Sequence, residues 1–300
     1  NNSGGFILWV AIADVAYYVT AGSALDKEAR TRGNSTYFPD RVVPMLPDRL
    51  SGDLCSLHEG VPRPCLAVRM KIDAQGAKIS HEFARGLMRS AASLNYQEVQ
   101  AARDGAPNEA CAPLMENVIT PLYDAYEALS IARKNRQPLE LDLPERKIVL
   151  GDDGKVSSVA VAERLDAHRM IEEFMVLANV CAAEELFHKN RPLLYRVHEE
   201  PSDEKMESLR EVALGSGLNL AKGQVLHTSH LNRLLAQAAG SQRADQHFYA
   251  AFNDAGVLSS AKLWPLRLGA AILCAFHITD QTLRRFDCAS CLDISQRLGG

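Results

Sequence analysis

The sequence predicts an α+β domain in which a mixed sheet with β-hairpins is packed by helices. Three observations support this: a long apolar run near the N-terminus, two pairs of strand-like segments around turn sequences, and several amphipathic segments of helix length. They follow one another without a regular alternation of strand and helix, which favours α+β over a doubly wound fold. With 300 residues, 47% of them hydrophobic, the chain can bury a sizeable core as one large domain or two.

The first elements are a strand and a short helix. Phe6–Val15 is almost continuously apolar, which is typical of a buried central strand. Asp14 interrupts this run, and a carboxylate at the end of a buried strand is costly unless it is paired or binds a metal. Asp14 therefore either caps the following turn or belongs to an acidic site. Ser23–Arg32 predicts a polar helix with Ser23 as its N-cap and Gly33 as its C-terminal stop.

The segment Asn34–Leu57 predicts an irregular wall laid over a core. Three prolines divide it into extended pieces, so it should not form a packed helix, and it is too apolar to be a solvated linker. Tyr37, Arg41 and Arg49 are free to face a cleft. Segments of this kind often carry function, although a purely structural role is the other interpretation.

The rest of the first 215 residues mixes two hairpins, a single strand and several helices. Turn sequences at 73–76 and 151–154 predict two hairpins, and turn chemistry explains the acidic second turn better than a metal does. Along the longest helix, Glu172, Glu173 and Asn179 are placed near the edge of the buried stripe. The predicted strands are Cys65–Asp73, Lys78–Met88, Leu139–Leu150, Val156–Val161 and Pro192–His198, and the predicted helices are Ser90–Arg103, Pro113–Arg136, Leu165–Asn190 and Ser202–Gly215.

Composition indicates a cytoplasmic protein. A net charge of −4 with 23% charged residues does not favour a nucleic-acid binder, although a basic channel inside an acidic surface is not excluded. Seven cysteines without regular spacing predict reduced thiols, with Cys55, Cys65, Cys111 and Cys181 filling the core. We expect no membrane association, because no apolar run reaches the roughly 20 residues of a membrane helix and no signal peptide is recognisable. The start at Asn1, directly before a strand, indicates a fragment of something longer.

Three stretches resemble the catalytic domain of the ribonuclease II (RNB) family. They are ILWVAIADVAYYV at Ile7–Val19, NSTYFPDRVVPMLPDRLSGDLCSL at Asn34–Leu57 and IEEFMVLANVCAAEEL at Ile171–Leu186. The resemblance covers about residues 4 to 246 in the family's order. It implies an RNB-type fold, with residues 1–246 forming a partial catalytic domain.

The tail, residues 247–300, differs from the rest of the chain. It has no clean period, and its Cys288-Ala-Ser-Cys291 pair is weak evidence for zinc or redox chemistry. The family's signature blocks, of the type GHFGL and SPIRR, are absent from it. A reading frame shifted by one base would restore both, from codons permitted for Lys262–Leu273 and Phe276–Ser295. The tail is therefore predicted to be a frameshifted reading of the end of the same domain.

The resemblance implies a 3′→5′ exoribonuclease that hydrolyses RNA processively to nucleoside 5′-monophosphates. Two Mg²⁺ ions roughly 4 Å apart would activate water and stabilise the leaving oxygen. In the family the aspartates that hold them lie just upstream of the strand that opens this chain, and an essential arginine lies in the SPIRR block. Both are missing, so the chain itself is expected to hold no metal and to be inactive. Asp14 would contact and orient the metal-binding aspartates without binding the metal itself. The alternative is a non-catalytic RNA-binding or regulatory protein that retains the fold.

The same resemblance implies RNA contacts for four residues. Tyr37 matches an aromatic residue that stacks on the 3′-terminal nucleotide, and stacking tolerates any base. Glu173 and Arg196 match positions near the RNA path, with a structural ion pair as the other interpretation. His198 would contact a metal or a phosphate, or be a core residue. The expected partner is the 3′ end of single-stranded RNA rather than DNA, bound by a monomer.

Overall fold

The computed structural model describes residues 4–138, 146–161, 163–191, 202–220 and 228–239. The chain divides into two compact units. The first comprises Asn1–Leu129, Glu145–Cys181 and Ile278–Gly300, and the second comprises Ser130–Pro144 and Ala182–His277. The proposed boundary at residue 246 and the tail 247–300, with Cys288 and Cys291, lie outside the described residues.

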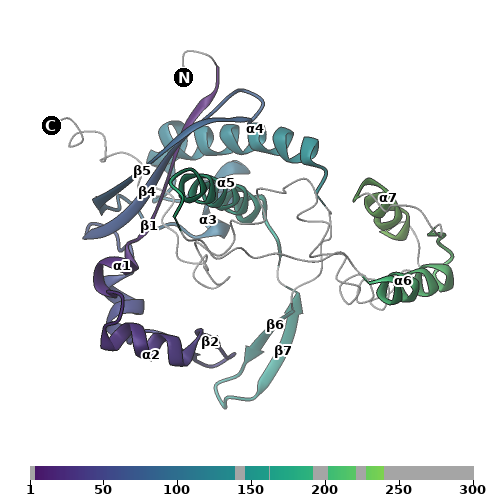
Figure 1. Cartoon of the computed structure of the whole chain (residues 1–300), viewed down its shortest axis with the longest axis horizontal. Coiled ribbons are helices and arrows are strands. Elements are labelled where there is room, and N and C mark those ends of the chain that lie inside the picture. The colour runs from purple at the N-terminus through teal and green to yellow at the C-terminus, as the bar shows by residue number, and fades with distance from the viewer. Residues whose placement is uncertain (1–3, 139–145, 162, 192–201, 221–227, 240–300) are drawn as a thin grey trace. The chain divides into compact units, whose positions relative to one another are not determined.

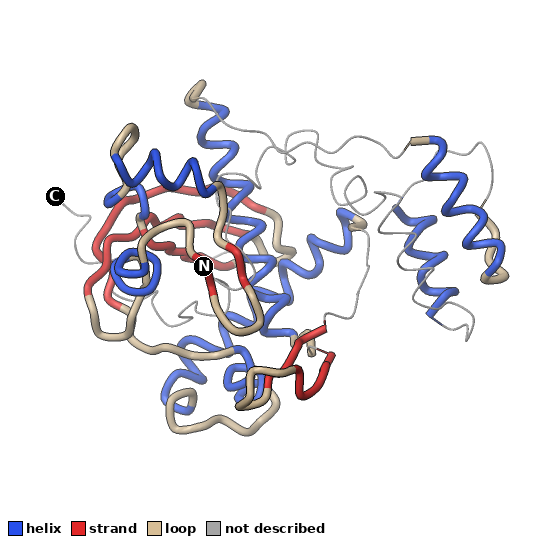
Figure 2. The backbone as a smooth tube through the Cα atoms, turned by 90° about the horizontal axis from the view of Figure 1, so that it is seen from below, coloured by secondary structure: helices blue, strands red, loops and turns tan. Residues whose placement is uncertain are grey.

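A three-stranded antiparallel sheet organises the first unit (Figure 1). It contains β1 (Phe6–Ala13), β4 (Pro62–Ile72) and β5 (Lys78–Arg89) in the order β1-β4-β5. The predicted first hairpin is confirmed, and its turn is held by Asp73 Oδ1, which accepts hydrogen bonds from the backbone N–H groups of Gln75 (2.9 Å) and Ala77 (2.8 Å). Figure 2 shows the three strands running side by side.

The prediction that the first strand is central is wrong for the described sheet. β4 lies in the middle and β1 lies at one edge, with Leu8 its only fully buried side chain. A continuous apolar run is typical of strands covered on both faces, but here the described residues cover mainly one face of β1. Its register places Leu8 opposite Met70 of β4, so the side chains of this face point into the core.

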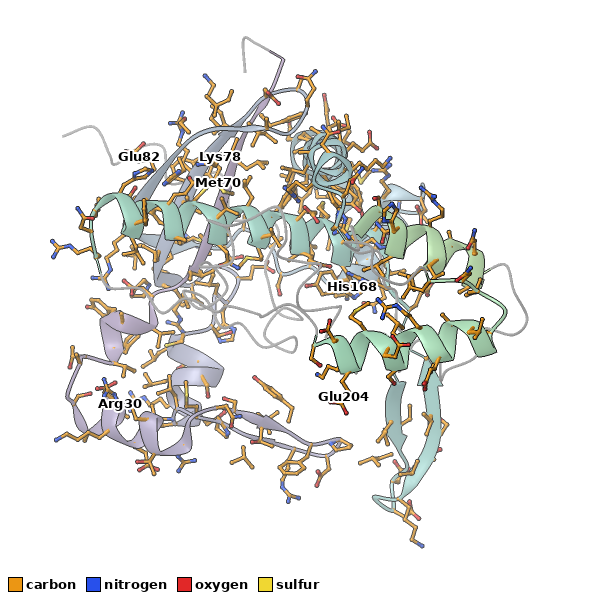
Figure 3. All side chains as sticks on the ribbon, turned by 45° about the vertical axis from the view of Figure 1, so that its right-hand side comes forward. Arg30, Met70, Lys78, Glu82, His168 and Glu204 are labelled. Carbon is orange, nitrogen blue, oxygen red and sulfur yellow. The ribbon has the colours of Figure 1, made fainter. Side chains whose placement is uncertain are left out.

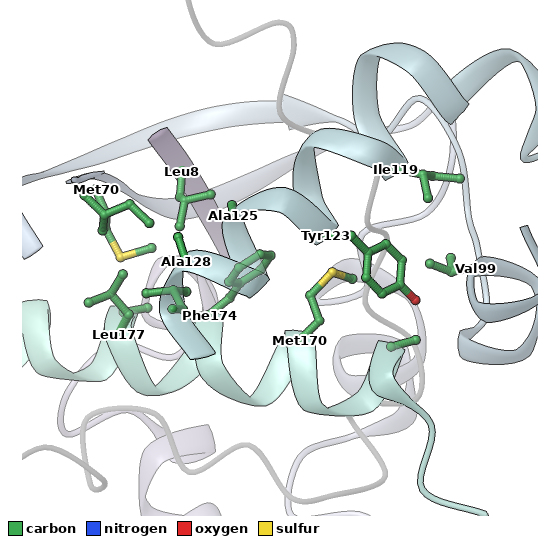
Figure 4. Packing of buried hydrophobic residues seen from close by; sticks show 14 of the residues in the cluster. Leu8, Met70, Val99, Ile119, Tyr123, Ala125, Ala128, Met170, Phe174 and Leu177 are labelled. Atoms are coloured by element: carbon green, nitrogen blue, oxygen red, sulfur yellow. The ribbon is translucent and has the colours of Figure 1, made fainter. Parts of the chain in front are cut away.

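The core of the first unit lies between this sheet and three helices, α3 (Tyr96–Arg103), α4 (Thr120–Arg136) and α5 (Asp166–His188). In Figure 4, Leu8 and Met70 of the sheet lie beside Ala128 of α4 and Leu177 of α5. Each buried large side chain contributes about 1.5–3 kcal/mol to stability. The α+β fold class predicted from the sequence is confirmed.

The helix boundaries follow local capping. Ser23 Oγ accepts from the N–H of Asp26 (3.1 Å), and α2 (Ala24–Arg32) ends at Gly33 with φ +75°, both as predicted. α3 begins at Tyr96 rather than Ser90, because Asn95 and Glu98 form a reciprocal capping box (2.9 and 3.0 Å). The segment predicted as one helix from Pro113 starts with a 3₁₀ turn (Ala112–Leu114) and a π-helical turn (Met115–Ile119) before α4.

The second predicted hairpin consists of β6 (Arg146–Leu150) and β7 (Val156–Val161). Its turn at Gly151–Gly154 closes through the N–H of Gly154 and the carbonyl of Gly151 (2.9 Å), as expected for turn chemistry. The first part of the predicted strand, residues 139–145, lies outside the described residues.

The described part of the second unit includes α6 (Asp203–Gly215) and α7 (Thr228–Ala239). The predicted N-cap of α6 is confirmed, since Ser202 Oγ accepts from the N–H of Lys205 (3.4 Å). α7 was not predicted from the sequence; its Asn232 side chain donates a hydrogen bond to the carbonyl of Pro138 (2.8 Å). The predicted strand Pro192–His198 lies outside the described residues. None of the described helices has the length and apolar character needed to cross a membrane.

Candidate functional site

The segment Asn34–Leu57 forms a small hairpin followed by a helical turn. β2 (Thr36–Tyr37) pairs with β3 (Val42–Val43), which places Thr36 opposite Val43 and Tyr37 opposite Val42. The predicted extended pieces are therefore present. The segment does not form a packed helix, as predicted, although Arg49–Leu54 forms a π-helical turn. The turn tolerates Pro47 because this proline precedes it, where no helical N–H is needed.

Three hydrogen bonds fix the hairpin. The N–H of Phe38 donates to the carbonyl of Arg41 (2.8 Å), which closes the tip. The N–H of Met45 donates to Ser35 Oγ (2.9 Å). Arg32, at the end of α2, donates through Nη1 to the carbonyl of Pro44 (3.3 Å). These bonds connect the hairpin to α2 and fix the backbone from which its exposed side chains project.

Aromatic side chains occupy both faces of this hairpin. Tyr37, the predicted RNA-stacking residue, is half-buried beside its cross-strand partner Val42. Phe38 follows it on the opposite face and is 44% exposed, with the Arg41 guanidinium 5.1 Å from the ring centroid. The sequence analysis named Arg41 but did not single out Phe38. Arg49 is exposed at the start of the π-helical turn.

Asp14 is buried and paired with Arg85 of β5. One carboxylate oxygen lies 2.7 Å from Arg85 Nε and the other accepts from Nη2 at 2.9 Å, a bidentate geometry. Asp14 occupies the predicted N-cap position of the short helix α1 (Val15–Tyr18), but its side chain pairs with Arg85 and makes no capping hydrogen bond. The ion pair satisfies the carboxylate and joins the end of β1 to β5 across β4.

On α5, two of the three polar side chains placed at the edge of the buried stripe lie inside it. Glu173 is 4% exposed and Asn179 is 6% exposed, whereas Glu172 forms an ion pair with Arg164 near the surface. Because Glu173 is buried, the part of the α5 surface that is covered by other residues is wider than the stripe predicted from the spacing of its apolar residues. The predicted contact of Glu173 with RNA stays a prediction. Arg196 and His198 lie outside the described residues.

A polar and aromatic cluster joins α3, α4 and α5, and the sequence analysis did not single it out. The rings of Tyr96 and His168 stack with centroids 4.1 Å apart and planes 25° apart. Gln100 Oε1 accepts from the N–H of Ala167 (3.2 Å) and from the hydroxyl of Tyr123 (3.4 Å). These contacts hold the start of α5 against α3. Figure 3 labels His168 on the ribbon.

The described cysteines are free thiols. Cys65, Cys111 and Cys181 are fully buried, as predicted, but Cys55 is only half-buried and does not fill the core. Burial raises the pKa of the Cys55, Cys65 and Cys111 thiols, so they are neutral at physiological pH and poor nucleophiles. Their chemistry supports a structural role.

The described residues do not fit a divalent metal centre. Among them, no group of three or more His, Cys, Asp or Glu side chains could hold a metal ion. The Asp14 carboxylate is already engaged by the Arg85 guanidinium. Mg²⁺ prefers several oxygen ligands in octahedral geometry, so we derive no metal-dependent step from this part of the chain.

The described part of the chain thus combines an α+β domain with an exposed aromatic hairpin and an ion pair between the buried Asp14 and the exposed Arg85. The sequence model of the RNB domain matches residues 1–276, and the chain belongs to this family. Ribonuclease R from Vibrio parahaemolyticus is 40% identical over 244 residues, which is 81% of this chain and 29% of that protein. Ribonuclease R from Escherichia coli is 37% identical over 247 residues, 82% of this chain and 30% of that protein.

Solved structures agree with this assignment. Mycoplasma genitalium RNase R, in complex with ribose-methylated single-stranded RNA, superposes with a TM-score of 0.77 at 28% identity. The alignment covers 83% of this chain and 39% of that one. Yeast Ssd1, described as a pseudonuclease, shares the fold at 18% identity with a TM-score of 0.58. The chain therefore spans only about a third of the length of the ribonucleases R it matches.

Proposed function

We propose that this chain is part of a 3′→5′ exoribonuclease similar to ribonuclease R, which hydrolyses RNA processively to nucleoside 5′-monophosphates. The observation that carries the proposal is 37–40% identity to ribonucleases R over four fifths of the chain. The RNA-bound relative of similar fold supports single-stranded RNA as the substrate. We expect a monomer that acts in the cytoplasm on the 3′ end of the RNA and does not act on DNA.

The proposed chemistry is two-metal hydrolysis with Mg²⁺. The metals would neutralise the phosphate, activate the attacking water and stabilise the leaving oxygen. Their ligands would come from carboxylates outside the described residues. Within this chain, the Asp14–Arg85 pair would fix the end of β1, and Tyr37 would supply a stacking surface for the 3′-terminal base.

The full gene product tests this proposal directly. It would be incubated with Mg²⁺ and a 5′-labelled single-stranded RNA, and the products would be resolved on a sequencing gel and by chromatography. We expect progressive shortening from the 3′ end and release of nucleoside 5′-monophosphates. Binding without any shortening would reject the exonuclease and favour a non-catalytic RNA-binding protein that retains the fold.

The chain of 300 residues alone is expected to have no measurable nuclease activity. Its described residues offer no cluster of carboxylates for the metals, and hydrolysis by the proposed route depends on them. The measurement is release of acid-soluble nucleotides from labelled RNA with Mg²⁺ present, beside the full gene product as a positive control. Mg²⁺-dependent degradation that co-purifies with the chain would refute this expectation.

Replacing Tyr37 by alanine in the full gene product is expected to lengthen the limit product more than it slows hydrolysis. Loss of a stacking contact weakens the hold on short RNAs by about 1–3 kcal/mol per base, so short products dissociate before they are degraded. The product-length distribution on a denaturing gel and the initial rate on a long RNA would be measured together. Tyr37→Phe, which keeps the ring, should retain the parental product length. An unchanged distribution for Tyr37→Ala would count against the stacking role.

A further inference from the structure

The second face of the β2–β3 hairpin carries an aromatic ring beneath a guanidinium group. Phe38 is 44% exposed, and Arg41 lies over its ring with Cζ 5.1 Å from the centroid. Arg41 Nη1 also donates to Asp40 Oδ2 at 2.8 Å. The guanidinium is therefore held from two directions, by the ring through a cation–π contact and by the carboxylate through a charge-assisted bond.

A hydrogen bond fixes the backbone beneath this arrangement. The N–H of Phe38 donates to the carbonyl of Arg41 (2.8 Å), which makes the two residues cross-strand neighbours. Val43, two positions beyond Arg41 on the same face, is 43% exposed. Phe38 and Arg41 lie outside the paired residues of the hairpin, because the pairing of β2 with β3 joins Thr36–Tyr37 to Val42–Val43. The Phe38 ring and the Arg41 guanidinium are therefore exposed on a hairpin backbone that hydrogen bonds already fix.

We propose that Phe38 and Arg41 form a second base-stacking platform for single-stranded RNA, on the hairpin face opposite Tyr37. This inference rests on the proposed RNA-degrading function and adds a contact to it. Unpaired bases stack on aromatic rings and on guanidinium planes, and a ring with a guanidinium fixed beside it offers both surfaces. Asp40 balances the charge of Arg41, so recognition of RNA by the platform rests on stacking of bases on the two planar groups.

The test measures RNA binding by the 300-residue chain, with Phe38→Ala compared with the parent protein. Two 5′-fluorescein-labelled probes of equal length are used in EDTA and moderate salt, an oligoadenylate and an abasic ribose-phosphate oligomer, and binding is followed by fluorescence anisotropy. Phe38→Ala is expected to weaken binding of the oligoadenylate about 5- to 10-fold and to leave the abasic oligomer unchanged. The abasic probe retains every phosphate, so only stacking distinguishes the two.

Two further variants sharpen the test. Val43→Ala removes apolar surface from the same face without removing a π system, and it should bind both probes like the parent. Arg41→Lys keeps the charge but loses the planar group, so it should weaken oligoadenylate binding about as much as Phe38→Ala. Circular dichroism would verify that each variant keeps the parental secondary structure.

The possible failures can be told apart. Unchanged oligoadenylate affinity in Phe38→Ala would overturn the platform while leaving RNA binding by the chain in place. So would an equal loss on the abasic probe, or an equal loss in Val43→Ala, because either would indicate a contact other than base stacking. If the parent chain binds neither probe, both the platform and RNA binding by this part of the proposed nuclease are rejected.

Discussion

Replacing Gly76 by alanine should destabilise the protein by about 4 kcal/mol. Gly76 lies in the β4–β5 turn with φ +76°, where an L-residue costs about 1–2 kcal/mol. A Cβ built on it would lie 2.2 Å from the carbonyl oxygen of Ala128 and 2.8 Å from the Cα of Leu129. Both atoms belong to the backbone of α4, which cannot rotate away as a side chain could. Either the helix or the turn must therefore move, and overpacking of this kind costs about 1–3 kcal/mol more.

Gly60→Ala is the matched control. Gly60 has a similar φ of +70°, but nothing lies within 4 Å of the Cβ that alanine would add. It should therefore lose only the backbone contribution, about 1 kcal/mol. Urea unfolding followed by far-UV circular dichroism would give both free energies of unfolding. Equal losses for the two variants would show that the turn does not pack against α4 as described.

Local signals in the sequence predicted the parts of the fold that depend on neighbouring residues. Ser23, Ser202 and the Asp73 turn were placed correctly, because each satisfies backbone N–H groups only a few positions away. The start of α3 was placed too early, although Asn95 and Glu98 carry the spacing of a capping box. α7 was missed, although its buried side chains recur at helical spacing; they are Leu231, Leu234, Leu235 and Ala238.

The candidate site was harder to predict, because its contacts join distant parts of the chain. Asp14 was recognised as a carboxylate that needs a partner, but Arg85 lies 71 positions away and no local pattern connects them. Tyr37 could be placed facing a cleft from its segment, but its stacking role followed only from the family resemblance. Phe38 was overlooked because an aromatic residue in an apolar segment is more often buried than exposed, and its exposure and its contact with Arg41 become visible only in the structure.

The burial of polar residues on α5 was also beyond what the sequence could predict. Apolar periodicity predicts which stripe of a helix is buried against one neighbour, so Glu173 and Asn179 were assigned to its edge. Both are buried, and a buried carboxylate is retained only where polar groups compensate its desolvation. The width of the buried arc is set by what packs around the helix, and the sequence of the helix itself does not contain that information.

Arg85→Ala should destabilise the protein by about 3 kcal/mol, because it leaves the buried Asp14 carboxylate without its counter-ion. Breaking a buried pair by removing one partner costs about 3–5 kcal/mol. We expect the lower end, since the Arg85 side chain is 61% exposed and the Asp14 side chain only 8% exposed. Arg69→Ala is the control on the same sheet. Arg69 Nη1 lies 4.0 Å from Glu82 Oε2, and both side chains are well exposed. The loss in free energy of unfolding should therefore stay below about 1 kcal/mol.

The double variant Asp14→Asn/Arg85→Ala separates the cost of an unpaired charge from the loss of packing. The asparagine keeps the shape of Asp14 without its charge, so the double variant should be more stable than Arg85→Ala alone by about 1–2 kcal/mol. Urea unfolding of the parent, the two single variants and the double variant would complete the cycle. If the double variant were less stable than Arg85→Ala, the Asp14 carboxylate would be compensated by groups other than Arg85. The bidentate pair would then not be what fixes the end of β1 to β5.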